Sequence, residues 1–136
     1  VEHYPHEPVH YGKAMAKKHS PRFLAIVEDA RAKISECSAS ELSKLVAEGA
    51  VVIDVREQHE FEAGHYVDAI HIGKGVIERD IEKQDFEIKQ KIVLYCGGGF
   101  RSAIAAKSLQ DMGYEDVISL WGGWRGILAE GLETKS

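Results

Sequence analysis

The strongest chemical signal in this chain is a cysteine that lies beside three glycines and an arginine. The segment from Tyr95 to Ser102 has the sequence Tyr-Cys-Gly-Gly-Gly-Phe-Arg-Ser, and it follows the apolar run Ile92-Val93-Leu94. A helical pattern begins after it, at Ala103. The spacing therefore predicts that Cys96 lies where a buried strand turns into a helix.

Such a turn favours an ionised thiol. Gly97, Gly98 and Gly99 lack Cβ atoms, so they can adopt positive φ angles and let backbone N–H groups converge on one point. The positive end of the following helix adds to the effect. Both features favour the thiolate, which is the nucleophilic form of cysteine. Arg101 supplies a fixed positive charge for an anionic substrate, and Ser102 could cap the helix or bond to the sulfur.

We therefore predict an active site with Cys96 as the catalytic residue. The alternative is a buried structural cysteine, which behaves as a small apolar residue. A structural cysteine needs neither three glycines nor an arginine, so the active role is favoured. The predicted loop that binds the substrate or its sulfur consists of Gly97, Gly98, Gly99, Phe100, Arg101 and Ser102.

Composition narrows the classes of function. The 136 residues suffice for one domain, and the net charge of −5 without a basic stripe gives no hint of a nucleic-acid partner. No apolar run reaches the ~18 residues of a membrane span, so no membrane partner is expected. The cysteines, Cys37 and Cys96, are too few for a disulfide scaffold, and a bridge between them would block the loop. Reduced thiols suit a cytoplasmic location. Because the chain starts at Val1, an upstream segment could have been removed.

The N-terminal segment, residues 1–36, is predicted to be a tail followed by a helix. Residues 1–11 lack periodicity, and His3, His6 and His10 have no Cys or carboxylate cluster beside them, so we expect no metal site there. Ser20 and Pro21 predict a helix start, and apolar residues at helical spacing extend the helix over 21–35. This helix is expected to pack on its own chain, with a partner chain as the alternative.

The rest of the chain alternates between helices and strands, which predicts the α/β class. Residues 51–55 form a run that is β-branched except at Asp54, as expected of a strand buried on both faces. A short helix and irregular turns are expected over 74–90. The other predicted strands are 69–72, 91–95 and 117–120, and the predicted helices are 41–48, opened by Ser40, then 57–62, 103–112 and 124–130.

Three segments together resemble the rhodanese family of sulfurtransferases, over roughly residues 37–130. They are Ile53-Asp54-Val55-Arg56-Glu57 with Glu60-Phe61 and Ala63-Gly64-His65, then Cys96 to Ser102, then Leu120-Trp121-Gly122-Gly123-Trp124. The resemblance implies a single rhodanese-like domain at 37–136, with a five-stranded parallel sheet flanked by helices. Residues 1–36 then form an N-terminal tail and helix extension.

The resemblance also implies a reaction. Cys96 would carry a persulfide and move sulfur in two half-reactions, from a donor such as thiosulfate to cyanide or a thiol, including a protein thiol. No metal or organic cofactor is implied, and the oligomeric state is left open. In the related phosphatases and arsenate reductases, five residues separate Cys from Arg. Here four residues separate Cys96 from Arg101, which favours sulfur over phosphate.

Some positions depart from the family pattern. After Gly64-His65 the family continues Ile-Pro-Gly-Ala, whereas this chain has Tyr66-Val67-Asp68-Ala69. Gly97 and Gly99 are similar to the branch that uses mercaptopyruvate, but Arg101 is not, so the donor stays open. A non-catalytic binding or regulatory module remains the alternative to an enzyme.

Other candidates lie near the ends of predicted strands. Arg56, Trp124 and Arg125 are candidate substrate contacts. For Arg56 the favoured alternative is an ion pair with Glu60 or Glu62. For Arg125, a surface salt bridge is an equally weighted alternative.

The remaining candidates are predicted to be structural. His65 suits a structural hydrogen bond better than a general base, and His59 is expected to be solvated on its helix. Of Trp121 and Trp124, one is expected to cover the active site and the other to pack in the core. Cys37 is expected to take no part, although it could accept sulfur if the N-terminal segment folds over the loop.

Overall fold

The computed structural model describes residues 19–136. The predicted tail and its three histidines, His3, His6 and His10, lie outside the described residues. Within 19–136, no helix is long and apolar enough to cross a membrane. In the same range, His, Cys, Asp and Glu side chains form no group of three that could hold a metal ion.

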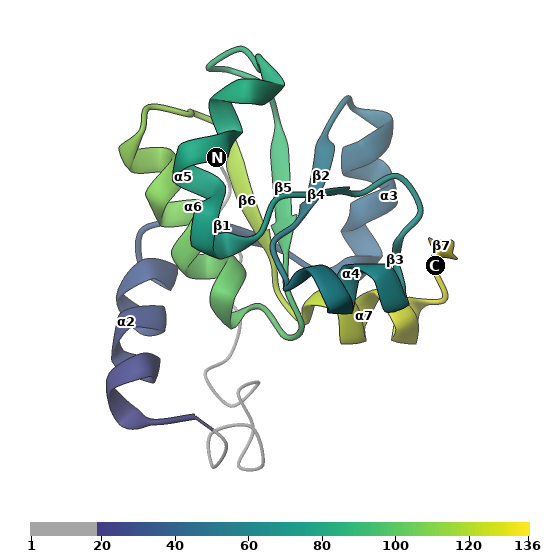
Figure 1. The fold of residues 1–136 in the computed structure, drawn as a ribbon, viewed down its shortest axis with the longest axis horizontal. Coiled ribbons are helices and arrows are strands. Elements are labelled where there is room, and N and C mark those ends of the chain that lie inside the picture. Colours follow the sequence, from purple (N-terminus) through teal and green to yellow (C-terminus); the bar gives the residue numbers. More distant parts are fainter. Residues whose placement is uncertain (1–18) are drawn as a thin grey trace.

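Five parallel strands form the central sheet, in the order β1-β6-β5-β2-β4 (Figure 1). They are β1 (Ser35–Cys37), β2 (Val51–Asp54), β4 (Ile70–His71), β5 (Ile92–Tyr95) and β6 (Val117–Leu120). A small antiparallel pair, β3 (His65–Tyr66) with β7 (Thr134–Lys135), lies apart from this sheet. The predicted α/β class with a five-stranded parallel sheet is confirmed.

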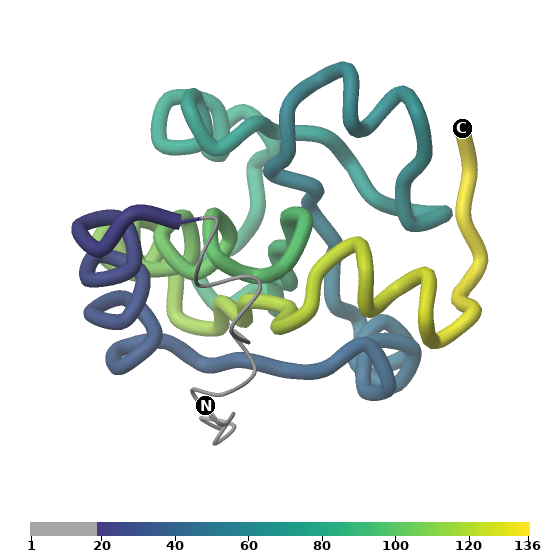
Figure 2. Tube along the Cα trace, turned by 90° about the horizontal axis from the view of Figure 1, so that it is seen from below, coloured from purple at the N-terminus to yellow at the C-terminus, as the bar shows by residue number. Residues whose placement is uncertain are grey.

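Helices cover both faces of the sheet (Figures 1 and 2). One face carries α2 (Pro21–Arg31), α5 (Ile77–Asp80) and α6 (Phe100–Asp111), whose buried residues share one apolar cluster. The other face carries α3 (Ala39–Ala47) and α7 (Gly123–Glu130), which share a second cluster. The remaining elements are α4 (Gln58–Ala63) and the 3-10 turns η2 (Lys74–Val76) and η3 (Ile81–Gln84).

The central strand β5 shows why its sequence is apolar throughout. Ile92 and Leu94 point into the first cluster, whereas Val93 and Tyr95 point into the second. All four side chains are fully buried. A parallel strand covered on both faces needs apolar residues at every position. The strand β5 ends at Tyr95, directly before the candidate nucleophile Cys96.

The N-terminal helix is shorter than the periodicity predicts. Ser20 caps α2 as expected, because its side chain accepts a hydrogen bond from the N–H of Phe23 at 3.4 Å. The predicted end at residue 35 is wrong, since α2 ends at Arg31 and Ser35 begins β1. Glu36 in β1 is buried because Arg31 Nε donates to its carboxylate at 2.9 Å. Because β1 contains the charged residue Glu36, its apolar pattern does not indicate a buried strand.

Helix α3 begins before its predicted start at Ser40. Its N-cap is Ser38, whose backbone N–H donates to the Glu41 carboxylate at 2.8 Å. This reciprocal arrangement of Ser and Glu three residues apart is a capping box. The glycine predicted to end this helix, Gly49, has a φ of +103° just after it.

Cys37 lies in β1 within the second apolar cluster and is fully buried. Burial, together with the carboxylates of Glu41 and Glu36, raises the pKa of Cys37 to about 12. Both cysteines are free, so the alternative of a bridge between Cys37 and Cys96 is excluded. The thiol of Cys37 is therefore poorly suited to accept sulfur.

We predict that Cys37 resists alkylation in the folded protein. At pH 8, iodoacetamide should modify Cys37 at least about a hundredfold more slowly in the native protein than in denaturant, because its thiolate is scarce and buried. Mass spectrometry of the peptide that contains Cys37 measures both rates. Similar rates in the two samples would contradict the buried position.

Candidate active site

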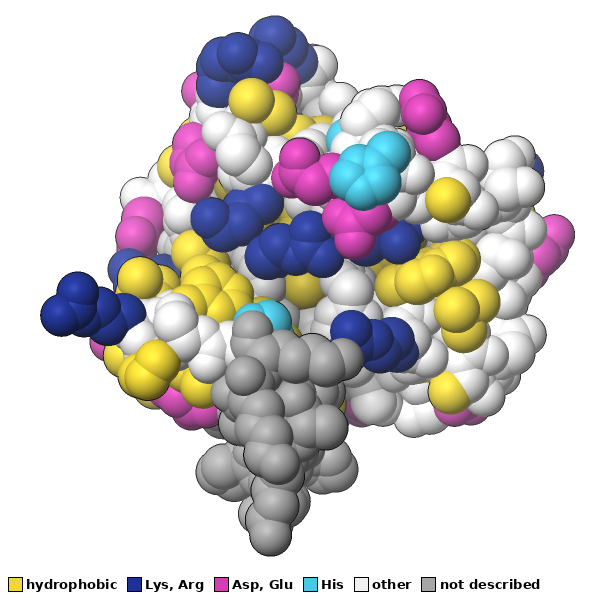
Figure 3. Space-filling model, turned by 60° about the horizontal axis from the view of Figure 1, so that its bottom comes forward, with side chains coloured by type: hydrophobic (Ala, Val, Ile, Leu, Met, Phe, Trp, Pro, Cys, Tyr) yellow, Lys and Arg dark blue, Asp and Glu magenta, His cyan; other side chains and the backbone are white. Residues whose placement is uncertain are grey.

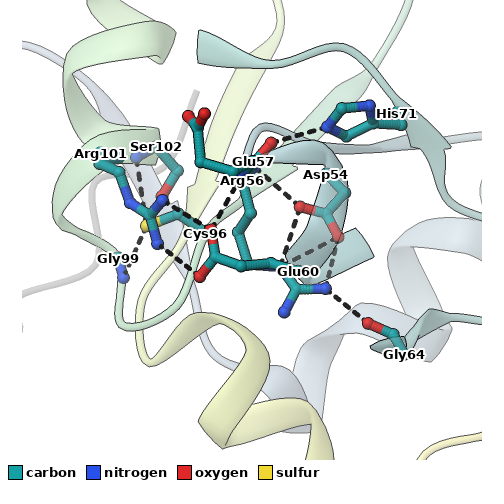
Figure 4. A network of polar contacts seen from close by, with 10 residues as sticks. All are labelled: Asp54, Arg56, Glu57, Glu60, Gly64, His71, Cys96, Gly99, Arg101 and Ser102. Carbon is teal, nitrogen blue, oxygen red and sulfur yellow. Dashed lines mark hydrogen bonds and ion pairs between the residues drawn. The ribbon is translucent and has the colours of Figure 1, made fainter. Parts of the chain in front are cut away.

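Cys96 lies at the carboxyl end of β5, and its sulfur is held by backbone N–H groups (Figure 4). Its Sγ accepts hydrogen bonds from the N–H of Gly99 at 3.1 Å and from the N–H of Ser102 at 3.4 Å. Helix α6 begins at Phe100, before the predicted position 103, so Ser102 belongs to its first turn. Two convergent donors at a helix N-terminus stabilise negative charge on the sulfur.

The three glycines of the loop play different parts. Only Gly99 has a positive φ, +107°, and a Cβ there would lie 2.9 Å from the ring of Trp121. At Gly97, a Cβ would lie 3.3 Å from the guanidinium of Arg101. All three glycines could adopt left-handed backbone, but among them only Gly99 does so. Gly97 instead leaves room for the arginine side chain.

The carbonyl groups of the loop point away from the sulfur and are bound by the start of α7. Three backbone N–H groups of the turn and the first turn of α7 act as donors: Gly122 to Gly98 O at 3.1 Å, Trp124 to Cys96 O at 2.7 Å and Arg125 to Gly97 O at 3.3 Å. The first N–H groups of a helix have no partner within it, so α7 satisfies them with the loop. This contact fixes the direction of each peptide group around Cys96.

Two buried hydroxyl groups extend the contacts of the sulfur into the sheet. The Cys96 thiol donates to Ser102 Oγ at 3.5 Å, and Ser102 Oγ lies 2.9 Å from Ser119 Oγ. Ser119 in β6 was missed by the sequence analysis. The available signal was a serine inside the apolar run Val117–Leu120, because a buried polar residue needs a partner.

Arg101 is held by a carboxylate from α4 (Figure 4). Its Nη1 donates to Glu60 Oε1 at 3.0 Å, and both side chains remain about one third exposed. The hydrogen bond from Arg101 holds the pKa of Glu60 below its usual range. Burial acts to lower the pKa of Arg101, but Glu60 and the nearby Cys96 sulfur outweigh burial and raise it. From the sequence, Glu60 was instead expected as one of two candidate ion-pair partners of Arg56.

A pocket of about 270 Å³ opens above the sulfur. On this face, Lys and Arg side chains form a band beside hydrophobic ones (Figure 3). Arg125 lines the pocket, and no carboxylate within residues 19–136 forms an ion pair with it. The lining residues are His19, Phe23, Cys96, Gly97, Gly98, Phe100, Arg101 and Arg125.

Arg56 does not line this pocket, and its predicted pairing with Glu60 or Glu62 is wrong. Its guanidinium is buried and donates to Asp54 Oδ2 at 2.7 Å and to the Gly64 carbonyl at 2.6 Å (Figure 4). Arg56 pairs with Asp54, the last residue of β2, because residues two positions apart in extended chain point to the same side. Arg56 therefore acts as a structural residue behind the loop.

Neither tryptophan lines the pocket, so the prediction that one covers the active site is wrong. Trp124 stacks with Tyr95, at 6.5 Å between ring centroids, and lies under the Arg56 guanidinium at 4.7 Å. Trp121 is buried in the core, as expected of one of the pair, and packs against Phe100.

The histidines of this region have structural contacts. His65 Nδ1 lies 2.8 Å from the carbonyl oxygen of Phe61, which confirms the predicted structural hydrogen bond. The His65 ring also stacks on the Phe61 ring, at 3.7 Å between centroids. His59 is exposed on α4, as predicted. Neither ring lines the pocket above Cys96.

The family assignment follows from the match of this fold and loop to known proteins. The family model of the rhodanese-like domain matches residues 38–130. The chain belongs to the rhodanese-like domain family. The match includes Cys96, its loop and the helix that binds the loop carbonyls.

Relatives carry several different descriptions. The thiosulfate sulfurtransferase GlpE of Coxiella burnetii is 34% identical over 92 residues, which cover 68% of this chain and 82% of GlpE. A tRNA uridine(34) hydroxylase of Leptospira interrogans is 33% identical over 65% of this chain, but over only 26% of the hydroxylase. Protein RPA3614 of Rhodopseudomonas palustris, described as a possible tyrosine phosphatase, superposes with a TM-score of 0.72 at 28% identity. That superposition covers 83% of this chain and 93% of RPA3614.

We predict that Gly123→Ala disrupts the loop more than a glycine substitution elsewhere. Gly123 has a φ of +50°, and a Cβ there would overlap the Cys96 carbonyl group. The strained φ and the overlap together should lower the free energy of unfolding by about 3 kcal/mol or more. Gly49→Ala is the matched control, because its φ is +103° but its Cβ would meet open space. Urea denaturation should show a loss of about 1–2 kcal/mol for this control, and equal losses would refute the close contact.

We also predict that Arg56→Met destabilises the protein without removing a substrate contact. Asp54 is fully buried, so losing Arg56 leaves an unpaired buried carboxylate and should cost about 3–5 kcal/mol. Denaturant titration measures the loss, and adding Asp54→Asn should restore part of it. Arg79→Met, which breaks an exposed pair with Asp80, should change stability little. A similar small effect at Arg56 would show that the buried pair is unimportant.

Proposed function

We propose that this protein is a sulfurtransferase that carries a sulfane sulfur as a persulfide on Cys96. The observation that carries the proposal is the convergence of the Gly99 and Ser102 N–H groups on Sγ at the floor of a pocket. A persulfide anion needs such donors to stabilise its charge. The likeness to GlpE, a protein named for thiosulfate sulfurtransferase activity, supports the same chemistry.

In the first half-reaction, the Cys96 thiolate attacks the outer sulfur of a donor such as thiosulfate. A bond forms between Sγ and that sulfur, while the bond to the sulfonate sulfur breaks and sulfite leaves with the electron pair. Arg101 and Arg125 line the pocket and face the departing anion. Glu60 keeps the Arg101 side chain in place, so less conformational entropy is lost when the anion binds.

In the second half-reaction, an acceptor removes the outer sulfur. A thiolate, including one on a protein, attacks that sulfur and becomes a persulfide, while Cys96 is released as a thiolate. Cyanide would leave as thiocyanate by the same displacement. Both half-reactions are nucleophilic displacements at sulfur, so the proposed reaction needs no metal or organic cofactor.

The direct test is the intact mass of the reduced protein after thiosulfate treatment. The wild type should gain one sulfur, ~32 Da, and a thiol reductant should remove it. Cys96→Ser should gain nothing, whereas Cys37→Ser should gain the sulfur like the wild type. A wild type that gains no sulfur while Cys96 is reduced would contradict the proposal and favour a binding module.

A second candidate, an aryl phosphatase, is favoured only by the likeness to RPA3614. Only four residues separate Cys96 from Arg101, a loop shorter than the one expected to surround a phosphate group. Hydrolysis of p-nitrophenyl phosphate by the wild type, lost in Cys96→Ser, would favour phosphatase chemistry over sulfur transfer.

A further inference from the structure

The N-terminal helix α2 and the residue before its N-cap supply part of the wall of the pocket above Cys96. His19 and Phe23 line the pocket together with Phe100, the first residue of α6. The ring centroids of His19 and Phe100 are 4.6 Å apart, and those of Phe23 and Phe100 are 6.3 Å apart. The third pair, His19 and Phe23, is 5.2 Å apart. Three rings in mutual contact thus form one aromatic side of the pocket.

This aromatic wall is firmly attached to the domain. Val27 and Ala30 of α2 are buried in the cluster that contains α6, and the two helices lie side by side (Figures 1 and 2). At the other end of α2, the guanidinium of Arg31 lies 4.0 Å from the centre of the Trp121 ring. Trp121 in turn lies against Gly99 of the loop. Both ends of α2 are therefore packed against elements of the active site.

Two other residues that line the pocket are cationic. They are Arg101 and Arg125, and Cys96 lines the same pocket. Guanidinium groups bind oxyanions, and aromatic rings bind flat apolar groups by stacking. Thiosulfate would satisfy the cations but would leave the rings without an apolar partner. The lining of the pocket combines aromatic rings with cations, and it suits a ligand that combines a ring with an oxyanion.

We propose that His19 and Phe23 are specificity-determining residues that favour an aryl thiosulfonate as the sulfur donor. The inference rests on the proposed sulfur transfer. A cavity of about 150 Å³ holds a benzene ring, so the pocket of about 270 Å³ has room for a ring and its sulfonyl group. The sulfonyl oxygens then face the arginines, and the aryl ring contacts the aromatic wall.

The reaction balances without a further reagent. The Cys96 thiolate attacks the terminal sulfur of the thiosulfonate, forms the Cys96 persulfide and releases an aryl sulfinate. The bond that breaks joins the terminal sulfur to the sulfonyl sulfur, and its electron pair leaves with the sulfinate. Two negative charges enter the step and two leave it, so no proton or electron is required.

The test compares two donors that differ only in the organic group, benzenethiosulfonate and methanethiosulfonate. The wild type should load Cys96 with a higher kcat/KM for the aryl donor. In Phe23→Leu and His19→Leu, the aryl-to-methyl ratio should fall roughly three- to tenfold, because a ring contact is lost while apolar volume is kept. Ile26→Ala is the matched control. Ile26 is on α2 but 56% exposed and outside the pocket, so the ratio should stay unchanged.

The outcomes separate this inference from the proposed function. If thiosulfate loads Cys96 but the wild type uses both thiosulfonates equally, the role of the wall is overturned and sulfur transfer stands. A ratio that Phe23→Leu leaves unchanged also overturns it. If no donor loads Cys96, calorimetry with benzenesulfonate and methanesulfonate decides. Tighter binding of the aryl ligand, lost in Phe23→Leu, supports the aromatic wall, and equal binding overturns it.

Discussion

The chemistry of Cys96 depends on the direction in which the peptide groups of its loop point. Carbonyl oxygens aimed at the sulfur would repel a thiolate, whereas N–H groups attract it. The loop directs three carbonyls to the start of α7 and leaves the N–H groups of Gly99 and Ser102 for the sulfur. The close approach of Gly123 to the Cys96 carbonyl makes this arrangement possible. The site is therefore built jointly by the loop and by the start of α7, which binds the loop carbonyls.

Two arginines near the site illustrate how environment separates structure from chemistry. Arg56 is buried, bound to Asp54 and the Gly64 carbonyl, and has no access to the pocket. Arg101 is partly exposed, lines the pocket and is held by Glu60. The Glu60 carboxylate reduces the net charge that an incoming anion meets, but it also keeps the guanidinium in one position. Such a site favours precise placement of an anion over the strongest attraction.

Local sequence signals predicted most of the fold and the centre of the site. The apolar run before Cys96 and the alternation of elements indicated the sheet, and Ser20 with Pro21 marked the start of α2 correctly. The strand β1 was not predictable from apolar patterns, because its Glu36 is buried only through the ion pair with Arg31. The positions of Trp124 and the partner of Arg56 also depend on contacts between elements distant in sequence. Spacing along the chain carries no information about such contacts.

The strand β1, whose Glu36 pairs with Arg31, extends the central sheet beyond the residues that match the family. The family match begins at residue 38, directly after β1. Residues Ser35–Cys37 pair with β6, and the Cys37 carbonyl accepts the N–H of Trp121 at 2.8 Å. Without β1, β6 would become an exposed sheet edge, open to pairing with other chains and prone to aggregation. The segment before the family match thus protects β6 from exposure at the sheet edge. A domain boundary placed at residue 38, where the family match begins, would leave out this strand.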